Sequence, residues 1–173
     1  MNRTTTSLHA VHVAPGPRID RVAAERAARD LLAALGADTA NESLRDTPRR
    51  MAAAYAELLS PSPFEPTTFP NDGAYDELVV VCDIDFHSLC EHHLLPFVGR
   101  AHVGYLPGER IVGISKLARV VDHFARNLQV QERLTKQVAT WLERELQPKG
   151  VGVVRDDPRT RSEFLSLTSR STS

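Results

Sequence analysis

Residues 79–97, VVVCDIDFHSLCEHHLLPF, combine a strand-forming pattern with the most reactive side chains of this chain. An apolar run passes into alternating polar and apolar residues, which predicts a β-strand. Cys90 and His93 follow, separated by two residues, so a thiolate and an imidazole from one loop could close on a single metal ion. His92 lies between them and must project elsewhere, where it could act as an acid or base. The stretch therefore predicts a strand that leads into half of a zinc site.

The third ligand of such a site is open. A catalytic zinc normally takes three protein ligands and keeps one position for water. Cys82 is the other cysteine of the chain, and His87 lies three residues before Cys90; either could complete the site. A lone Cys-x-x-His spacing is also compatible with a buried thiol and a hydrogen-bonded imidazole in a protein core. From the residues alone, a metal site and a buried thiol–imidazole pair are both possible.

The composition indicates a single domain with a helical extension. The chain has 173 residues, 42% hydrophobic and 25% charged, which is ordinary for a globular protein. A net charge of −1 gives no overall attraction to nucleic acid or to a membrane surface. Two cysteines argue against a disulfide framework, and no apolar run reaches the roughly 18 residues of a membrane span. We therefore expect a cytoplasmic protein without nucleic-acid or membrane partners.

Before the strand, the sequence predicts a tail and two helices. Residues 1–18 are expected to be flexible. Asp20 can cap a helix that runs to about residue 35, where Gly36 ends it. One face of that helix carries the apolar residues Val22, Ala27, Leu31 and Leu35. A second helix starts at Thr47–Pro48, an N-cap followed by proline, and ends near Ser60. The proline-rich stretch 60–70 is expected to be a surface loop.

After the strand, strands come before helices. Strands are predicted at 100–106 and 110–114, and again at 150–154. Two helices with apolar stripes are predicted between them, one beginning with Ser115 as its cap and one spanning about 130–146. A last helix is predicted after a capping box at 160–163. This order favours the α+β class over an alternating α/β fold.

Several polar residues near these helix starts are candidates for binding. The free N–H groups at Ser115, with Lys116 and Arg119, could hold a phosphate chain, or they could be an ordinary cap with solvated side chains. Glu132, with Gln131, could accept the N–H donors of a purine edge, although a carboxylate is favoured at a helix start without any function. Arg50 lies in a helix's first turn, where a cation is unfavourable unless an anion binds there.

Linked motifs extend along most of the chain and identify a resemblance. They are RDTPRR at 45–50, SLCEHHLLPF at 88–97, GISKLAR at 113–119, LQVQERLT at 128–135 and TRSEFL at 160–165. In these motifs the chain resembles the GTP cyclohydrolase I family from about residue 20 to residue 167.

The resemblance implies a tunnelling fold (T-fold), an antiparallel sheet backed by two long helices and preceded by an N-terminal helical arm. On this basis the arm spans 19–70 and the T-fold domain 71–168, with a loose tail at 169–173. It also implies a homo-oligomer, a decamer in the family, with active sites at subunit interfaces.

The resemblance also implies a reaction and its residues. The family hydrolyses GTP to 7,8-dihydroneopterin triphosphate and formate, in tetrahydrofolate and pterin biosynthesis. By position, Cys90 and His93 resemble zinc ligands and His92 the acid/base for attack of water on C8. Glu132 with Gln131 resembles the guanine anchor. The triphosphate contacts are matched by Ser115, Lys116, Arg119 and Arg50.

The sequence departs from the family pattern after Val154. There the family continues with a strand carrying a second histidine and a second cysteine, the third zinc ligand, and then an Arg-Gly-x-Arg segment. Here residues 155–159 lead directly to the closing helix. Three hypotheses follow. The chain is a compact cyclohydrolase completed by local substitutes or a neighbouring subunit, or a catalytically impaired paralogue that binds GTP and assembles with a full-length enzyme, or an inactive shortened product.

Overall fold

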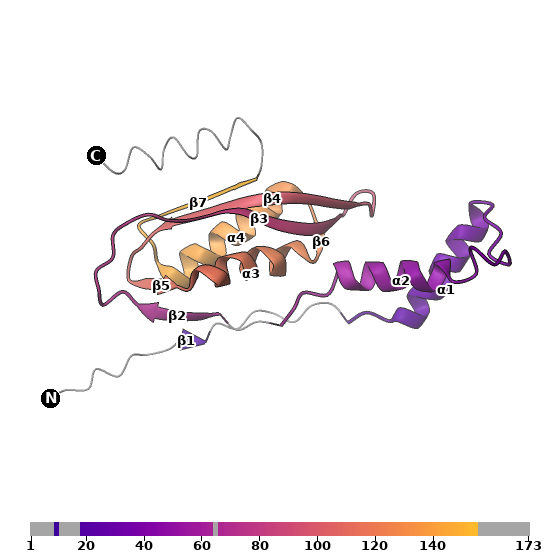
Figure 1. Ribbon diagram of the computed structural model, residues 1–173, viewed down its shortest axis with the longest axis horizontal. Helices are drawn as coiled ribbons and strands as arrows, with labels where there is room; N and C mark the ends of the chain where they lie inside the picture. The colour runs from indigo at the N-terminus through magenta and orange to yellow at the C-terminus, as the bar shows by residue number, and fades with distance from the viewer. Residues whose placement is uncertain (1–8, 11–17, 64–65, 156–173) are drawn as a thin grey trace.

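The computed structural model describes residues 9–10, 18–63 and 66–155, and within them the chain has an α+β fold (Figure 1). The helices are α1 (Arg21–Ala34), α2 (Thr47–Leu58), α3 (Ile114–Ala125) and α4 (Gln131–Leu146). The strands are β1 (His9–Ala10), β2 (Thr67–Pro70), β3 (Val79–Cys90), β4 (Pro96–Leu106), β5 (Arg110–Val112), β6 (Leu128–Gln129) and β7 (Gly150–Arg155).

The main sheet has the strand order β6-β3-β4-β7. The long strands β3 and β4 form an antiparallel hairpin, and β7 pairs antiparallel with β4 as an edge strand. A register shift between Val81 and Ile84 interrupts the β3–β4 ladder, and Asp83 has a positive φ of 55° there. The short strand β6 pairs parallel with the end of β3. Antiparallel pairing therefore predominates, as expected for the α+β class.

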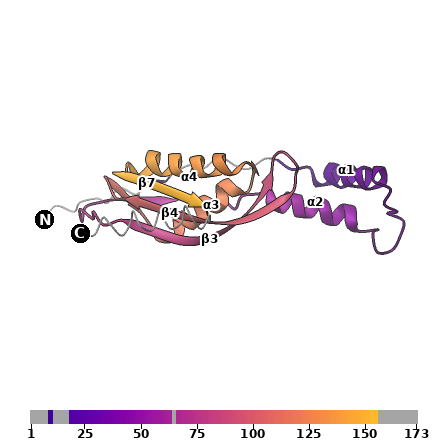
Figure 2. The ribbon, with the colours of Figure 1, turned by 90° about the horizontal axis from the view of Figure 1, so that it is seen from above.

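Helices α3 and α4 cover one face of the main sheet (Figures 1 and 2). The core between them is formed by Phe86, Val103 and Tyr105 from the strands and by the apolar stripes of both helices. These stripes were predicted from the sequence. They are Leu117, Val120 and Val121 on α3, with Phe124 partly buried, and Leu134, Val138, Trp141 and Leu142 on α4. Burial of these stripes fixes both helix axes, and hence the ends of the helices, against the sheet.

Helices α1 and α2 pack against each other and extend beyond the hairpin end of the sheet (Figures 1 and 2). Asp20 caps α1 through its Oδ1, which accepts from the N–H groups of Val22 and Ala23, and Gly36 follows with a φ of 79°. The predicted apolar face of α1 is nevertheless exposed: Val22, Leu31 and Leu35 are 67%, 52% and 73% accessible. The helix instead packs through its Ala28 side, which leaves the larger residues uncovered within this chain.

The structure corrects three further details of the sequence prediction. The stretch 60–70 is not wholly a loop, because Thr67–Pro70 forms β2 and pairs with β5. Residues 9–10 lie in the predicted flexible tail, yet they form β1 and pair with β2. Helix α2 begins at Thr47 with Asp46 as its N-cap, so Thr47 is one position inside the predicted boundary. The predicted closing helix and the tail at 169–173 lie outside the described residues.

Candidate functional site

Strand β3 ends at Cys90, and residues 90–95 form a tight connection to β4, called the metal turn below. The Cys90 N–H donates to the Leu95 carbonyl at 2.9 Å, and the Leu94 N–H donates to the Cys90 carbonyl at 2.9 Å. Leu94 has a positive φ of 55°, which lets the chain reverse over so few residues. Within this turn Cys90 Sγ lies 3.5 Å from His93 Nδ1. The predicted pair is therefore brought together.

The spacing of this pair fits two positions of a tetrahedral zinc site. Zn–S and Zn–N bonds of about 2.3 and 2.05 Å at a tetrahedral angle place the two donor atoms about 3.5 Å apart. The observed Sγ···Nδ1 distance has that value. Among the described residues, however, no group of three His, Cys, Asp or Glu side chains is placed to hold a metal. The turn therefore brings together two candidate ligands, and no third side chain of these types joins them in the part of the chain that the structure describes.

The two suggested third ligands are remote from the pair. Cys82 lies eight residues earlier on β3, about 25 Å along an extended strand. His87 is closer, but it is exposed, and alternation along β3 places it on the face opposite Ser88. The Ser88 hydroxyl donates to the Ala125 carbonyl at the end of α3. Neither residue completes the site within one chain.

His92 lies beside the pair and packs against the ring of His93. Its side chain is 63% exposed, and its ring stands edge-to-face on the His93 ring at 6.0 Å between centroids. Its Nε2 lies 3.8 Å from Glu91 Oε1. The imidazole is thus accessible to a ligand and has a carboxylate beside it, an arrangement suited to proton transfer.

The pairing of β6 with β3 brings the start of α4 beside the metal turn. Leu128 and Gln129 lie opposite Leu89 and Cys90 in the parallel ladder. Helix α4 begins two residues later, so Gln131 and Glu132 occupy its first turn, with Val130 as the N-cap. The structure thus places the predicted purine-binding residues near the predicted metal pair, from segments about forty residues apart.

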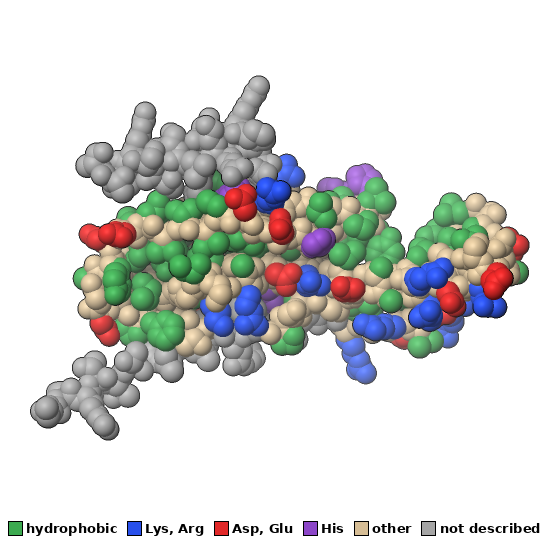
Figure 3. All heavy atoms as spheres, in the orientation of Figure 1, with side chains coloured by type: hydrophobic (Ala, Val, Ile, Leu, Met, Phe, Trp, Pro, Cys, Tyr) green, Lys and Arg blue, Asp and Glu red, His purple; other side chains and the backbone are tan. Residues whose placement is uncertain are grey.

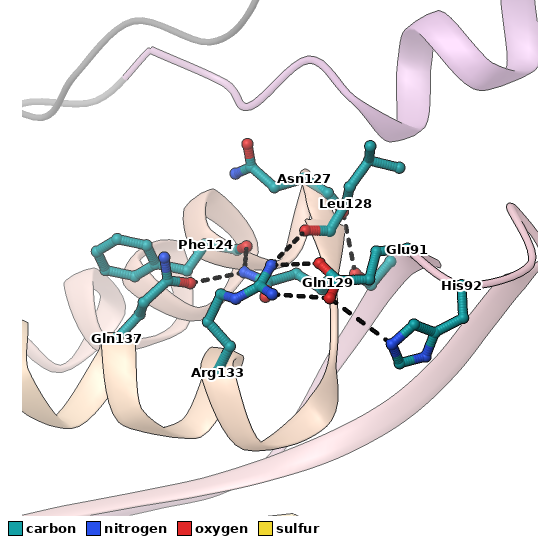
Figure 4. A network of polar contacts seen from close by, with 9 residues as sticks. Glu91, His92, Phe124, Asn127, Leu128, Gln129, Arg133 and Gln137 are labelled. Carbon is teal, nitrogen blue, oxygen red and sulfur yellow. Dashed lines mark hydrogen bonds and ion pairs between the residues drawn. The ribbon is translucent and has the colours of Figure 1, made fainter.

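A polar network joins these two segments (Figure 4). Glu91 in the metal turn forms a two-pronged ion pair with Arg133 on α4, and Arg133 Nη1 also donates to the Leu128 carbonyl. The hydrogen bond from Arg133 lowers the pKa of the Glu91 carboxyl, and the same bond raises the pKa of the Arg133 guanidinium. Both groups are therefore charged near neutral pH. We did not predict roles for Glu91 and Arg133 from the sequence, because no local pattern links residues so far apart.

Two of the predicted phosphate-binding residues, Ser115 and Lys116, lie at the N-terminal end of α3, the end opposite Ala125. Gly113, not Ser115, is the N-cap, and Ser115 lies within the first turn, which corrects the predicted boundary. Because α3 rises about 15 Å between Ser115 and Ala125, and Ala125 is bonded to Ser88, the start of α3 is distant from the metal turn. Ser115 and Lys116 therefore do not join the Cys90–His93 pair in one chain.

Arg119 and Arg50 are held by separate contacts. Arg119 donates to the Pro63 carbonyl at 3.3 Å and lines a cleft of about 640 Å³ with Asp83, Asp85 and Asp122. Arg50 donates to the Ser43 carbonyl and to Thr47 Oγ1 on the arm.

The arm also touches the metal turn. The Tyr55 hydroxyl on α2 donates to the Leu94 carbonyl at 3.2 Å. No local sequence pattern predicts this contact. It shows that α2, the helix that carries Arg50, reaches the turn.

Comparison with known proteins assigns these motifs to one family. The family model of GTP cyclohydrolase I matches residues 24–167. The chain is 52% identical over 138 residues to "GTP cyclohydrolase 1" of Sulfurihydrogenibium sp. (strain YO3AOP1), covering 80% of this chain and 74% of the relative. This chain belongs to the GTP cyclohydrolase I family. It is also 48% identical over 136 residues to "GTP cyclohydrolase 1" of Aquifex aeolicus, with 79% and 74% coverage. It is 51% identical over 136 residues to "GTP cyclohydrolase 1" of Brucella anthropi, covering 76% of this chain and 64% of the relative.

Proposed function

We propose that this chain is a GTP cyclohydrolase I, which hydrolyses GTP to 7,8-dihydroneopterin triphosphate and formate. The observation that carries this proposal is identity of about one half, over about four fifths of the chain, to relatives named GTP cyclohydrolase 1. The site supports it, because a thiol–imidazole pair, an exposed imidazole and a carboxylate at a helix start all lie at one end of the main sheet. An impaired paralogue is not favoured by these relatives.

The fold is compatible with a tunnelling fold. The antiparallel strands β3, β4 and β7 are backed on one face by α3 and α4. We propose the arm as residues 19–70 and the T-fold domain as 71–168. No helix among the described residues is long and apolar enough to cross a membrane. The proposed setting is the cytoplasm, in tetrahydrofolate and pterin synthesis, with neither nucleic acid nor membrane as partner.

Cys90 and His93 are the proposed zinc ligands, on the strength of their spacing and donor types. Bound there, zinc would supply Lewis-acid activation of water. The third protein ligand is proposed to come from a neighbouring subunit, since the described residues of one chain provide none.

Each remaining site residue has a role that its position permits. His92 would move protons as water adds to C8 of the purine, because its imidazole is exposed beside the pair. Glu132 would accept the N–H donors of guanine, with Gln131 beside it, in the first turn of α4. The triphosphate would bind the amides at the start of α3, together with Ser115, Lys116, Arg119 and Arg50.

The distance between these groups favours a site shared between copies of the chain. One chain separates the start of α3 from the metal turn by roughly the length of that helix, about 15 Å. Exposed apolar side chains also lie at and near the metal turn and on helix α1 of the arm, among charged side chains (Figure 3). They are Leu94, Leu95, Val98, Leu128, Val22, Leu31 and Leu35. Apolar patches of this kind mark association surfaces, so a homo-oligomer is proposed.

Formate release from GTP tests the function. The purified protein, supplied with zinc, is compared with Cys90→Ala and with Cys82→Ala, which removes an exposed thiol remote from the turn. The proposal expects release from the wild type and from Cys82→Ala, and none from Cys90→Ala. Soluble, folded wild-type protein that releases no formate would refute it, and GTP binding in that sample would revive the impaired-paralogue hypothesis.

A further inference from the structure

One ion pair joins the metal turn to the start of α4. Glu91 directly follows Cys90, and Arg133 directly follows Glu132. Arg133 Nη1 donates to Glu91 Oε2 at 2.5 Å, and Nη2 donates to Oε1 at 2.8 Å (Figure 4). Two parallel bonds between planar groups fix an angle as well as a distance. The pair therefore constrains how the turn is oriented toward the helix.

The surroundings of the pair are built to hold it. The Glu91 N–H donates to the Gln129 carbonyl at 3.1 Å, and Arg133 Nη1 reaches the Leu128 carbonyl at 3.3 Å. Gln129 is only 1% exposed, and its Nε2 donates to the Phe124 carbonyl and to Gln137 Oε1. A buried amide thus anchors β6 to both helices, and β6 supports both partners of the ion pair.

The size of the interaction argues against a role in stability alone. The Arg133 and Glu91 side chains are 44% and 28% exposed. Ion pairs at such accessible positions contribute little to the free energy of folding, because water screens both charges. The catalytic rate is much more sensitive to geometry, because a displacement of about 1 Å between reacting groups can lower the rate about a hundredfold. An effect on catalysis much larger than the effect on stability would therefore distinguish a positioning role.

We propose that the Glu91–Arg133 ion pair positions the metal turn relative to the first turn of α4. This inference rests on the proposed function, because the turn carries the acid/base and the helix carries the guanine anchor. Neither partner needs to touch the substrate; both are positioning residues. Without the pair, guanine would still bind at Glu132, but its C8 would no longer be held in register with His92 and the metal ligands.

Steady-state kinetics of Glu91→Gln, Arg133→Met and the double variant test the proposal. We expect kcat to fall about ten- to a hundredfold in each single variant, while KM for GTP changes less than about threefold. The double variant should be no worse than the poorer single variant, since the two residues act as one unit. Arg133→Lys should recover only part of the rate, because an ammonium cannot make the paired bonds. The melting temperature should hardly change.

The matched control is Arg144→Met. Arg144 is on the same helix, is 64% exposed and pairs with Glu145 near the other end of α4. Its loss should leave kcat and KM unchanged. Independent, additive losses from the two single variants, or a rate loss that matches a loss of folded protein, would overturn the proposal.

Hydrogen exchange gives a second readout that needs no turnover. Amides in residues 88–95 and 128–135 should exchange faster in Arg133→Met and Glu91→Gln than in wild type, and at wild-type rates in Arg144→Met. Unchanged exchange in both segments would count against the positioning role. If wild-type protein releases no formate, the proposed function fails, and the exchange data still decide whether the ion pair holds the turn.

Discussion

The two ends of α3 differ in how completely the chain prepares them for a ligand. At its C-terminal end, β6 and the start of α4 gather around the metal turn, and a two-pronged ion pair and a buried amide hold them together. At its N-terminal end, Ser115 and Lys116 follow a glycine cap that provides no side-chain hydrogen bond. One end is therefore an ordered group of polar contacts, and the other is the proposed anion-binding surface about 15 Å away. This difference is the basis of the proposal that two copies meet to make one site.

The largest expected effect comes from substitution of the two proposed zinc ligands, Cys90 and His93. Cys90→Ala and His93→Ala should each weaken zinc binding by at least about a hundredfold, because each removes one of the two ligands proposed for one chain. Zinc content after dialysis against a weak chelator measures this. Cys82→Ala should retain wild-type zinc. Wild-type occupancy in both turn variants would refute the site.

Complementation tests whether the two ends serve one site in different copies. Lys116→Ala and Cys90→Ala chains should each lose most activity alone. Mixed by co-expression, they should regain up to about a quarter of wild-type activity, because random assembly pairs two intact ends in that fraction of sites. Formate release per chain is the measurement. A mixture no more active than the better parent would mean that each site lies within one chain.

Substitutions at the two ends of α3 should also differ, by a smaller factor, in which ligand they weaken. Glu132→Ala should weaken GTP binding about tenfold and leave the affinity for inorganic triphosphate unchanged, since the contact proposed for the carboxylate is with the base alone. Lys116→Ala should weaken both ligands, because it acts on the phosphates. Isothermal titration of each variant with each ligand gives the four affinities. Equal losses of both ligands in Glu132→Ala would contradict the guanine-anchor role.

Much of this architecture follows from sequence patterns that act locally. The stripes on α3 and α4 predicted the core, and the spacing of Cys90 and His93 predicted a pair that the turn indeed brings together. What the sequence concealed depends on pairing between distant segments. The two-residue strand β6 is too short to show a period, yet its register with β3 places α4 beside the turn.

The N-cap of α3 and the exposure of the apolar face of α1 were also predicted less well, because both depend on more than the local sequence. Ser115 is a favourable cap by composition, but the extended backbone of Gly113 begins the helix two residues earlier. The apolar face of α1 was correctly periodic but is left exposed, because periodicity says which face is apolar and not what covers it. An association surface has the same pattern as a core surface.

The smallest expected effect is a pH dependence of the free energy of unfolding, caused by His123 near the C-terminal end of α3. His123 lies in the last turn of α3, and burial lowers its pKa below the usual 6.5, partly opposed by the charge of Asp122. As pH falls below about 6.5, the unfolded chain takes up a proton that the folded chain resists, so the free energy of unfolding decreases. One group contributes at most about 1.4 kcal/mol per pH unit, and only down to its folded pKa.

Urea unfolding between about pH 5 and pH 7.5 measures that slope. His123→Gln should flatten it, because the group that takes up the proton is gone. His87→Gln, at an exposed position on β3, is the matched control. An unchanged slope in His123→Gln would assign the acid sensitivity elsewhere. A flattened slope would assign it to His123 in the last turn of α3.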